Sequence, residues 1–390
     1  VTISTANDNL TFDGGNVILS TAGTTTIDTE LGGSGAGNIL FDGTIDGTSS
    51  QSEALVINTG SGTLQLQGTI GGTNPVTTLD INSTNGSAGP IEIVGIGDSD
   101  TAGATGAVTV GNTATTTLTL DGTVYKTDDA QTYVASATGD DSGQNIDITG
   151  AATFTTTNDA VAFNTSGVDL ANNGTTTINT GTGAGDVTFA GALESNGGSN
   201  DLLVITSGAG DVTFTGAVGA TNALGGLDVN SSAGDGDITF SSTIGDSGNA
   251  GVVGTTAIGG TATEDVNLAG LIYKFDGGTT ITAADGDNIK LTGSGDVTFT
   301  TAADAIEFAT GHIHLANGSN LVVDTGAAGG NITIAEIACT SQETVTLDAG
   351  TGTTSVGAIG SGTEIGDLSI GSAQNGGITL NGAIVTDGTV

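Results

Sequence analysis

The feature that most constrains the fold is a short repeat in which apolar residues alternate with threonine and follow a glycine–aspartate turn. It is clearest in residues 202–245, where Val-Thr-Phe at 212–214 recurs as Ile-Thr-Phe at 238–240. Alternation with a period of two is typical of a strand that has one buried and one solvated face. Repetition about every 25 residues, with a strand pattern and no helix pattern, predicts a solenoid.

The composition agrees with many short strands joined by tight turns. The 390 residues include 69 glycines and only two prolines, and they lack methionine, tryptophan and arginine. Threonine, valine, isoleucine and glycine dominate, which favours strands and turns over helices. The apolar share, 36%, is too regularly spaced for a disordered chain. We therefore expect an all-β solenoid.

The sequence also contains a longer repeat that spans several coils. The dipeptide Tyr-Lys at 125–126 recurs at 273–274, and an aspartate that precedes a strand ending in phenylalanine recurs at 8, 159 and 304. Each long repeat, of roughly 148 residues, would hold about six coils. We predict one continuous solenoid of three supermodules, at residues 1–151, 152–296 and, incomplete, 297–390.

The charge is strongly negative. The formal net charge at pH 7 is −39, and the basic residues are Lys126, Lys274 and Lys290 besides two histidines. Coils of about 25 residues stacked at ~4.8 Å would carry roughly one charge per 2 Å. Duplex DNA carries one per ~1.7 Å. Electrostatic repulsion therefore excludes nucleic acid and anionic lipid as partners, and cations are the expected binding partners.

Several other classes of protein are disfavoured. Cys339 is the single cysteine, so no disulfide can form within the chain and a thiol redox site is not expected. No apolar run of ~18 residues occurs, so we expect no membrane insertion. The chain starts at Val1 without an initiator methionine or a signal peptide, which leads us to expect a mature product or an excised segment.

A single coil cannot fold alone. About five buried apolar side chains at ~2 kcal/mol each do not offset ~1 kcal/mol per residue of backbone ordering over ~25 residues. Stability must come from neighbouring coils. The last residues, 387–390, carry no polar cap, and an uncovered coil is a bare sheet edge. We expect either caps outside this segment or self-association, end to end or lateral.

The turn-and-strand units at 183–189 and 293–299 resemble the β-strand repeats of very large bacterial surface and secreted proteins, of the filamentous-haemagglutinin and autotransporter-adhesin kind. The resemblance covers the whole length and is compositional. It implies a right-handed parallel β-helix with coils of about 25 residues, an extracellular or cell-surface location, and a role as stalk, fibre or adhesin. No secretion domain is visible, so the export route stays open.

Aspartates in the glycine-rich turns are the candidate ligands for calcium, which prefers oxygen. If the coils stack evenly, these aspartates lie in register along one edge. The strict Gly-Gly-x-Gly-x-Asp nonapeptide of calcium-binding β-rolls is absent, however, and aspartate also serves turns by bonding its own backbone. Both interpretations stay open, and no other cofactor is expected. The five residues are Asp186, Asp211, Asp235, Asp237 and Asp296.

Two smaller motifs have a structural and a functional interpretation. His312 and His314 fall on one face of a predicted strand and form a candidate metal pair, but the other supermodules have no matching histidines. In the Tyr-Lys dipeptides, the tyrosine would cover a coil edge while the lysine neutralises nearby carboxylates. The alternative for these dipeptides is a crosslink or a partner contact.

Two further classes of function remain as alternatives. Polysaccharide-acting enzymes occur on β-helices, so the fold does not exclude catalysis. The longest irregular stretch, 127–144, holds Asp128, Asp129, Asp140 and Asp141, and a carboxylate pair can hydrolyse a glycosidic bond. Threonine triplets, as at 24–26 and 175–177, suggest ice binding, although threonine also fills outward strand positions.

The sequence therefore favours a structural protein without a catalytic site: a rigid, anionic rod, fibre or adhesin stalk of a bacterial surface. The alternative is a calcium-dependent surface-layer or matrix protein, in which cations bridge neighbouring rods. A polysaccharide-acting enzyme is less favoured, since the chain has no arginine and only three tyrosines and ten phenylalanines to line a sugar site.

Overall fold

A computed structural model describes residues 1–31, 37–84, 87–138, 144–196, 198, 200–230, 232, 234–286, 288–371 and 376–390. These residues form strands, turns and bends without a helix, so none could cross a membrane as a long apolar helix. Strands pair in parallel with strands about 25 residues along the chain, which confirms the predicted all-β parallel solenoid. The chain divides into two compact units, Val1–Leu193 and Glu194–Val390, called unit 1 and unit 2.

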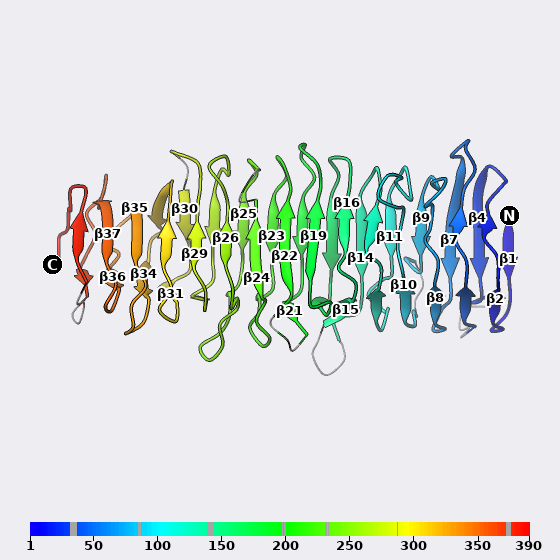
Figure 1. Ribbon diagram of the computed structural model, residues 1–390, viewed down its shortest axis with the longest axis horizontal. Helices are drawn as coiled ribbons and strands as arrows, with labels where there is room; N and C mark the ends of the chain where they lie inside the picture. Colours follow the sequence, from blue (N-terminus) through cyan, green and yellow to red (C-terminus); the bar gives the residue numbers. More distant parts are fainter. Residues whose placement is uncertain are drawn as a thin grey trace. The chain divides into compact units, whose positions relative to one another are not determined.

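Three columns of parallel strands run through the coils of unit 1, and strands of successive coils lie side by side (Figure 1). The first column contains β1 (Thr2–Ser4), β4 (Gly23–Asp28), β7 (Glu53–Asn58), β9 (Leu79–Ile81), β11 (Val108–Val110), β14 (Gln131–Val134), β17 (Val161–Asn164) and β20 (Val187–Phe189). The second contains β2 (Leu10–Phe12), β5 (Ile39–Phe41), β8 (Leu64–Leu66), β10 (Ile91–Ile93), β12 (Leu118–Leu120), β15 (Gln144–Ile148) and β18 (Gly167–Leu170). The third contains β3 (Val17–Ile18), β6 (Ile45–Asp46), β13 (Val124–Lys126), β16 (Thr153–Thr155) and β19 (Thr175–Asn179), with single bridges through Ile70 and Ile96.

Unit 2 repeats the three-column arrangement, and β21 (Leu193–Ser195) spans the boundary between the units. Its first column contains β22 (Leu202–Thr206), β24 (Gly226–Val229), β26 (Thr256–Ile258), β29 (Thr279–Ile281), β32 (Ile306–Phe308), β35 (Ile332–Cys339), β37 (Thr354–Ile359) and β39 (Ile378–Leu380). The second contains β23 (Val212–Phe214), β25 (Ile238–Phe240), β27 (Val266–Leu268), β30 (Asn288–Leu291), β33 (His312–Leu315) and the second half of β35. The third contains β28 (Ile272–Lys274), β31 (Gly295–Thr300), β34 (Ser319–Asp324), β36 (Val345–Asp348) and β38 (Leu368–Ile370).

The alternation read from the sequence decides which side chains are buried. In β25, Ile238 and Phe240 are buried while Thr239 between them is partly exposed. The register places Val212 beside Ile238 and Phe214 beside Phe240, so the repeat found in the sequence corresponds to one coil. The two phenylalanine rings stack with centroids 4.6 Å apart and planes 8° from parallel. The buried phenylalanine of one coil therefore packs on its counterpart in the next coil.

Unit 1 contains a longer aromatic stack. Rings of Tyr133, Phe163 and Phe189 follow one another at centroid distances of 5.4 Å and 5.0 Å. Beside them, Tyr125 stacks on Phe154 at 4.9 Å, and Phe154 meets Phe163 edge-on. All five side chains are buried. The core thus continues without a break past residue 151, where we placed the first supermodule boundary.

Matched contacts recur one long repeat apart, one set in each unit. The backbone N–H of Thr59 donates to Asn82 Oδ1, and Asn82 Nδ2 donates to Thr59 Oγ1, both at 2.7 Å. Ser207 and Asn230 make the same two bonds at 2.9 Å and 2.8 Å. Both asparagines have a φ of 53°, a left-handed turn conformation that asparagine tolerates. The longer repeat is therefore a structural equivalence, and the three supermodule boundaries stay a prediction.

Candidate functional site

A row of carboxylates in unit 2 lies directly before the strands of the second column. Asp211 precedes β23, Asp237 precedes β25 and Asp265 precedes β27. Asp211 Oδ1 accepts the backbone N–H of Asp237 at 2.9 Å, and Asp237 Oδ1 accepts the backbone N–H of Asp265 at 3.0 Å. We call these three residues the aspartate row. Each of its bonds joins one coil to the next, so the row satisfies backbone donors at the points where strands begin.

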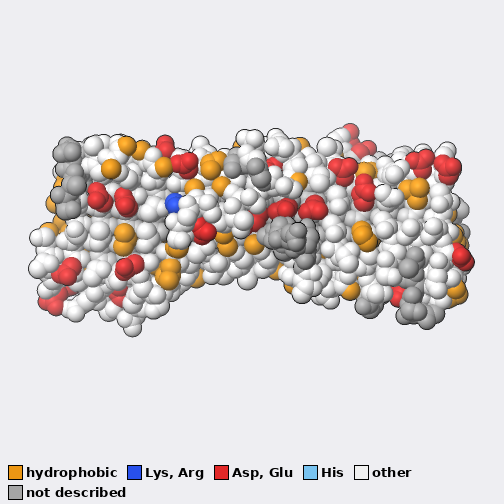
Figure 2. Space-filling model, turned by 90° about the horizontal axis from the view of Figure 1, so that it is seen from below, with side chains coloured by type: hydrophobic (Ala, Val, Ile, Leu, Met, Phe, Trp, Pro, Cys, Tyr) orange, Lys and Arg blue, Asp and Glu red, His pale blue; other side chains and the backbone are white. Residues whose placement is uncertain are grey.

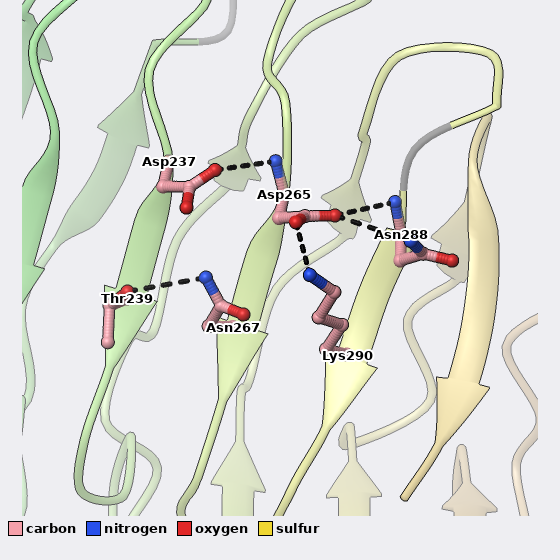
Figure 3. Close-up of polar contacts among 6 residues, drawn as sticks. All are labelled: Asp237, Thr239, Asp265, Asn267, Asn288 and Lys290. Atoms are coloured by element: carbon pink, nitrogen blue, oxygen red, sulfur yellow. Dashed lines mark hydrogen bonds and ion pairs between the residues drawn. The ribbon is translucent and has the colours of Figure 1, made fainter. Parts of the chain in front are cut away.

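The aspartate row ends at an ion pair, drawn in Figure 3. Asp265 Oδ1 accepts the backbone N–H of Asn288 at 3.0 Å, and Asp265 Oδ2 pairs with Lys290 Nζ. Burial by itself raises the pKa of Asp265, but the bonds from Lys290 and Asn288 outweigh it, so the pKa lies below its usual value. The carboxylate is therefore ionised at neutral pH and engaged in holding β27 against β30.

Only some of the aspartates predicted as calcium ligands lie close together. Asp211 and Asp237 are neighbours in the aspartate row. Asp235 lies in the turn before β25, where its side chain is exposed and its backbone N–H donates to the carbonyl oxygen of Gly208 at 2.9 Å. Three of the five thus lie at two consecutive turns of unit 2.

The other two predicted ligands lie outside these two turns. Asp296 belongs to β31 in the third column, where Oδ1 accepts a bond from Asn320 Nδ2 at 2.9 Å. Asp186 lies in unit 1, directly before β20. The expectation of one common register is therefore wrong for Asp296. The reason is that a similar interval recurs in all three columns, so spacing alone does not assign a residue to a column.

No group of three or more histidine, cysteine, aspartate or glutamate side chains is arranged as metal ligands within the described ranges. The turn aspartates instead have protein partners, as the aspartate row and Asn320 show. Calcium at the turns stays a prediction.

The two tyrosines of the Tyr-Lys dipeptides lie in the core. Tyr125 and Tyr273 are fully buried, and each Oη accepts the backbone N–H of the residue three positions earlier at 2.9 Å. Tyr125 Oη also donates to the carbonyl oxygen of Ile93 at 2.8 Å. The rings stack on Phe154 and Phe299. The expectation that they cover a coil edge was wrong, because an aromatic residue there adds to the buried stack.

The lysines of the same dipeptides reach across one coil. Each Nζ donates to the carbonyl oxygen of the residue 27 positions earlier, at 3.0 Å for Lys126 and 3.3 Å for Lys274. The neighbouring carboxylates, Asp98 and Asp246, have lowered pKa values. The main cause is the backbone N–H groups of their own turns, and the lysine charges add to it. This agrees with the prediction that the lysines neutralise nearby carboxylates.

Sequence reasoning missed an extensively bonded carboxylate. Glu53 is 1% exposed and accepts the backbone N–H groups of Thr48 and Ser52, both at 3.1 Å. It also accepts hydroxyl groups of Thr48, Ser50 and Ser52 at 2.7 Å, 3.2 Å and 3.0 Å. These bonds, led by those of Thr48, lower its pKa to about 2. The signal in the sequence is the hydroxyl-rich run that precedes it, 48–52.

Sequence reasoning also missed two buried carboxylates, which lie beneath equivalent loops, one in each unit. Asp46 and Glu194, which stand one long repeat apart, are both buried. Asp46 Oδ1 accepts the backbone N–H groups of residues 73–74 at 2.8 Å and 3.3 Å, and Glu194 Oε2 accepts those of residues 221–222 at 3.1 Å and 2.7 Å. Burial raises the pKa of Glu194 despite these bonds. Both carboxylates fix a loop to the coil before it.

Two adjoining hollows lie over the loops of unit 2, with volumes of about 320 Å³ and 270 Å³. They share Gly248, Ala250 and Asp276, and Lys274 lines the second. Their linings consist mainly of small and polar residues, so they offer hydrogen-bonding groups and no aromatic platform apart from part of Phe275.

The stretch proposed as an alternative catalytic site is partly regular structure. Residues 131–134 form β14, and Tyr133 within it is buried, so the stretch is not irregular throughout. Asp128 donates its backbone N–H to the carbonyl oxygen of Ala104 at 3.0 Å. Asp140 and Asp141 lie outside the described residues.

The remaining surface motifs follow the strand alternation. In the threonine triplets, the middle residues Thr25 and Thr176 are buried, so only alternate threonines face water. His312 and His314 lie on one face of β33, as predicted, and that face is turned to solvent. The face in Figure 2 shows acidic side chains spread among polar atoms, with hydrophobic side chains in small separate groups.

Comparisons with known proteins assign no family to this chain. No family model, no curated protein and no solved structure matches it. The resemblance to filamentous-haemagglutinin and autotransporter-adhesin repeats therefore stays a prediction from the sequence.

Proposed function

We propose that this chain is an extracellular structural repeat protein, a rigid anionic rod that serves as a fibre or adhesin stalk of a bacterial surface. The observation that carries the proposal is the use of carboxylates as ties between coils. Asp211, Asp237 and Asp265 each bond a backbone N–H of the following coil. A chain whose acidic groups reinforce its own stacking is suited to bearing load.

The packing supports the same role. Internal coils are joined to their neighbours by paired strands or single bridges in three columns and by stacked side chains, such as Phe163 between Tyr133 and Phe189. Releasing one coil would break all of these contacts together, and in a solenoid each coil depends on its nearest neighbours. We therefore propose a mechanical rather than a catalytic role.

The charge supports the location and the partners that we propose. A formal net charge of −39 disfavours contact with nucleic acid and with anionic membranes. It also keeps a stiff particle dispersed in water, and it attracts cations. An extracellular rod would meet these conditions, with self-association end to end or side by side as the route to a longer fibre.

Electron microscopy of the purified chain tests this function. We expect rods or fibres of uniform width in negative stain, and resistance to a broad-specificity protease under native conditions. Compact round particles would contradict the proposal. So would hydrolysis of polysaccharide in a reducing-sugar assay.

A calcium-dependent surface-layer or matrix protein is the second candidate. The observation in its favour is the aspartate row, which places one carboxylate on each of three consecutive coils. Calcium binds such oxygen ligands. Sedimentation before and after chelation with EDTA separates the two candidates. A loss of assembly that calcium restores and magnesium does not favours the second, and unchanged sedimentation favours the first.

A further inference from the structure

The two histidines of the chain share one solvent-facing surface with a glutamate of the next coil. His312 and His314 alternate with buried residues in β33. The register of β33 with β35 pairs Ile313 with Ile337 and His314 with Ala338. Glu336 therefore lies opposite His312, and its Oε2 atom is 3.5 Å from His312 Nε2.

This separation is that of two ligands of one tetrahedral metal ion. Zinc bonds of about 2.0–2.2 Å to nitrogen and oxygen place neighbouring ligand atoms roughly 3.3–3.5 Å apart. The observed 3.5 Å between His312 Nε2 and Glu336 Oε2 meets that requirement. Both side chains are partly exposed, 38% and 26%, so the space between them is open to solvent.

His314 is placed to supply a third ligand. Residues two apart on a strand lie roughly 6.6 Å apart on the same face, a span that two imidazoles can close around one ion. Glu336 is the diagonal neighbour of His314, at a distance that long side chains bridge. No three such side chains already surround one point among the described residues, so His314 must turn toward β35. Its neighbour on that side is Ala338, whose side chain is a single methyl group.

The surrounding charges permit a cation here. Lys290 lies opposite His314 on β30, on the side away from Glu336. Its charge is balanced by the ion pair with Asp265. The chain as a whole is strongly negative, which raises the local concentration of divalent cations.

We propose that His312, His314 and Glu336 bind one divalent transition-metal ion of the zinc class, with water in the fourth position. Two histidines and one carboxylate are an established ligand set for zinc. The ion would join β33 to β35 and so clamp two consecutive coils. This inference is independent of the proposed fibre role, because it concerns one face of two coils.

The test is a zinc titration by calorimetry at neutral pH, with magnesium in large excess to occupy the carboxylates elsewhere. We expect one zinc ion per chain that magnesium does not displace. Cobalt in place of zinc should give the intense visible absorption of a four-coordinate ion. Replacing a ligand in His314→Ala or Glu336→Gln should weaken zinc binding by at least about 10–100-fold, the effect of losing even an outer-shell partner.

The control is Lys290→Gln, which changes a partly exposed side chain on the same face and should leave the affinity equal or higher. The side chains of His314, Glu336 and Lys290 are all partly exposed, so the circular dichroism spectrum should be unchanged in each of the three variants. Equal zinc affinity in the wild type and His314→Ala overturns the proposal. So does a wild type that binds no zinc in excess magnesium, or a weak cobalt spectrum typical of six-coordinate ions.

Discussion

Replacing Tyr125 by phenylalanine tests whether the buried hydroxyl ties neighbouring coils together. The substitution keeps the ring stacked on Phe154 and removes only Oη. That atom accepts the backbone N–H of Gly122 at 2.9 Å and donates to the carbonyl oxygen of Ile93 at 2.8 Å. The perturbation is therefore the loss of two buried hydrogen bonds with little change in packing.

The two bonds are not equivalent. The carbonyl oxygen of Ile93 keeps a second donor, the backbone N–H of Asp121 at 3.0 Å, so losing Tyr125 there costs an ordinary ~0.5–1.5 kcal/mol. The N–H of Gly122 loses its side-chain acceptor inside the protein, which costs ~1–3 kcal/mol. Together these give a local destabilisation of about 3 kcal/mol.

Native-state hydrogen exchange is the suitable assay, because a stack of coils can open locally without unfolding as a whole. A change of about 3 kcal/mol corresponds to exchange roughly 100-fold faster. We expect that increase in peptides covering β10, β12 and β13. The matched control is Thr132→Ala on the solvent-facing side of β14, which should change stability by less than ~0.5 kcal/mol. Exchange that rises less than about threefold in Tyr125→Phe, or equally in the control, would refute the reasoning.

Three further predictions concern charge and backbone conformation. The folded pKa of Glu53, about 2, lies below its ordinary value of 4.5, so its contribution to stability is complete above pH 4.5 and is lost as the pH falls through 2. Glu53→Gln should therefore be less stable than the wild type near pH 7, with the difference vanishing near pH 2 in urea titrations; a constant difference would contradict this. Gly219→Ala should destabilise by more than ~1 kcal/mol, since φ is +61° and its Cβ would lie 2.0 Å from a backbone oxygen of the next coil. Gly286→Ala is the control for the strain of a positive φ alone, because φ there is +97° and no atom lies within 4 Å of the added Cβ. An equal loss of stability in the two variants would show that the close approach at Gly219 has no effect. Lys290→Gln should raise the pKa of Asp265, measured by carbon NMR of the carboxyl group, and an unchanged pKa would mean that the ion pair does not form in solution.

The fold was predictable because its main signal is local. Alternation in Val212–Phe214 and Ile238–Phe240, with the interval between them, predicted both the strands and their register. The column to which a strand belongs was not predictable, because similar intervals separate strands in every column. That ambiguity placed Asp296 with the wrong neighbours.

The buried carboxylates were less predictable than the strands. Glu53 follows a hydroxyl-rich run whose bonds to it form only when the turn folds, whereas Glu194 occurs in an ordinary sequence context and depends on distant donors. For Glu194 those donors are 27 and 28 positions along the chain. The prediction that the tyrosines cover a coil edge failed because their polar hydroxyl suggested a surface position. In the structure, Oη of Tyr125 has its hydrogen-bond partners inside the protein.

The bonds of the aspartate row have a bearing on how such a chain changes length during evolution. Each aspartate of the row bonds a backbone N–H of the next coil, and the three bonds span 26, 28 and 23 residues, so turns absorb differences of several residues. A single-residue insertion inside a strand would instead exchange its inner and outer faces. Gene duplication of an entire coil leaves every donor with an equivalent acceptor. Descendants of this sequence should therefore differ by complete turns, and by small changes confined to the corners.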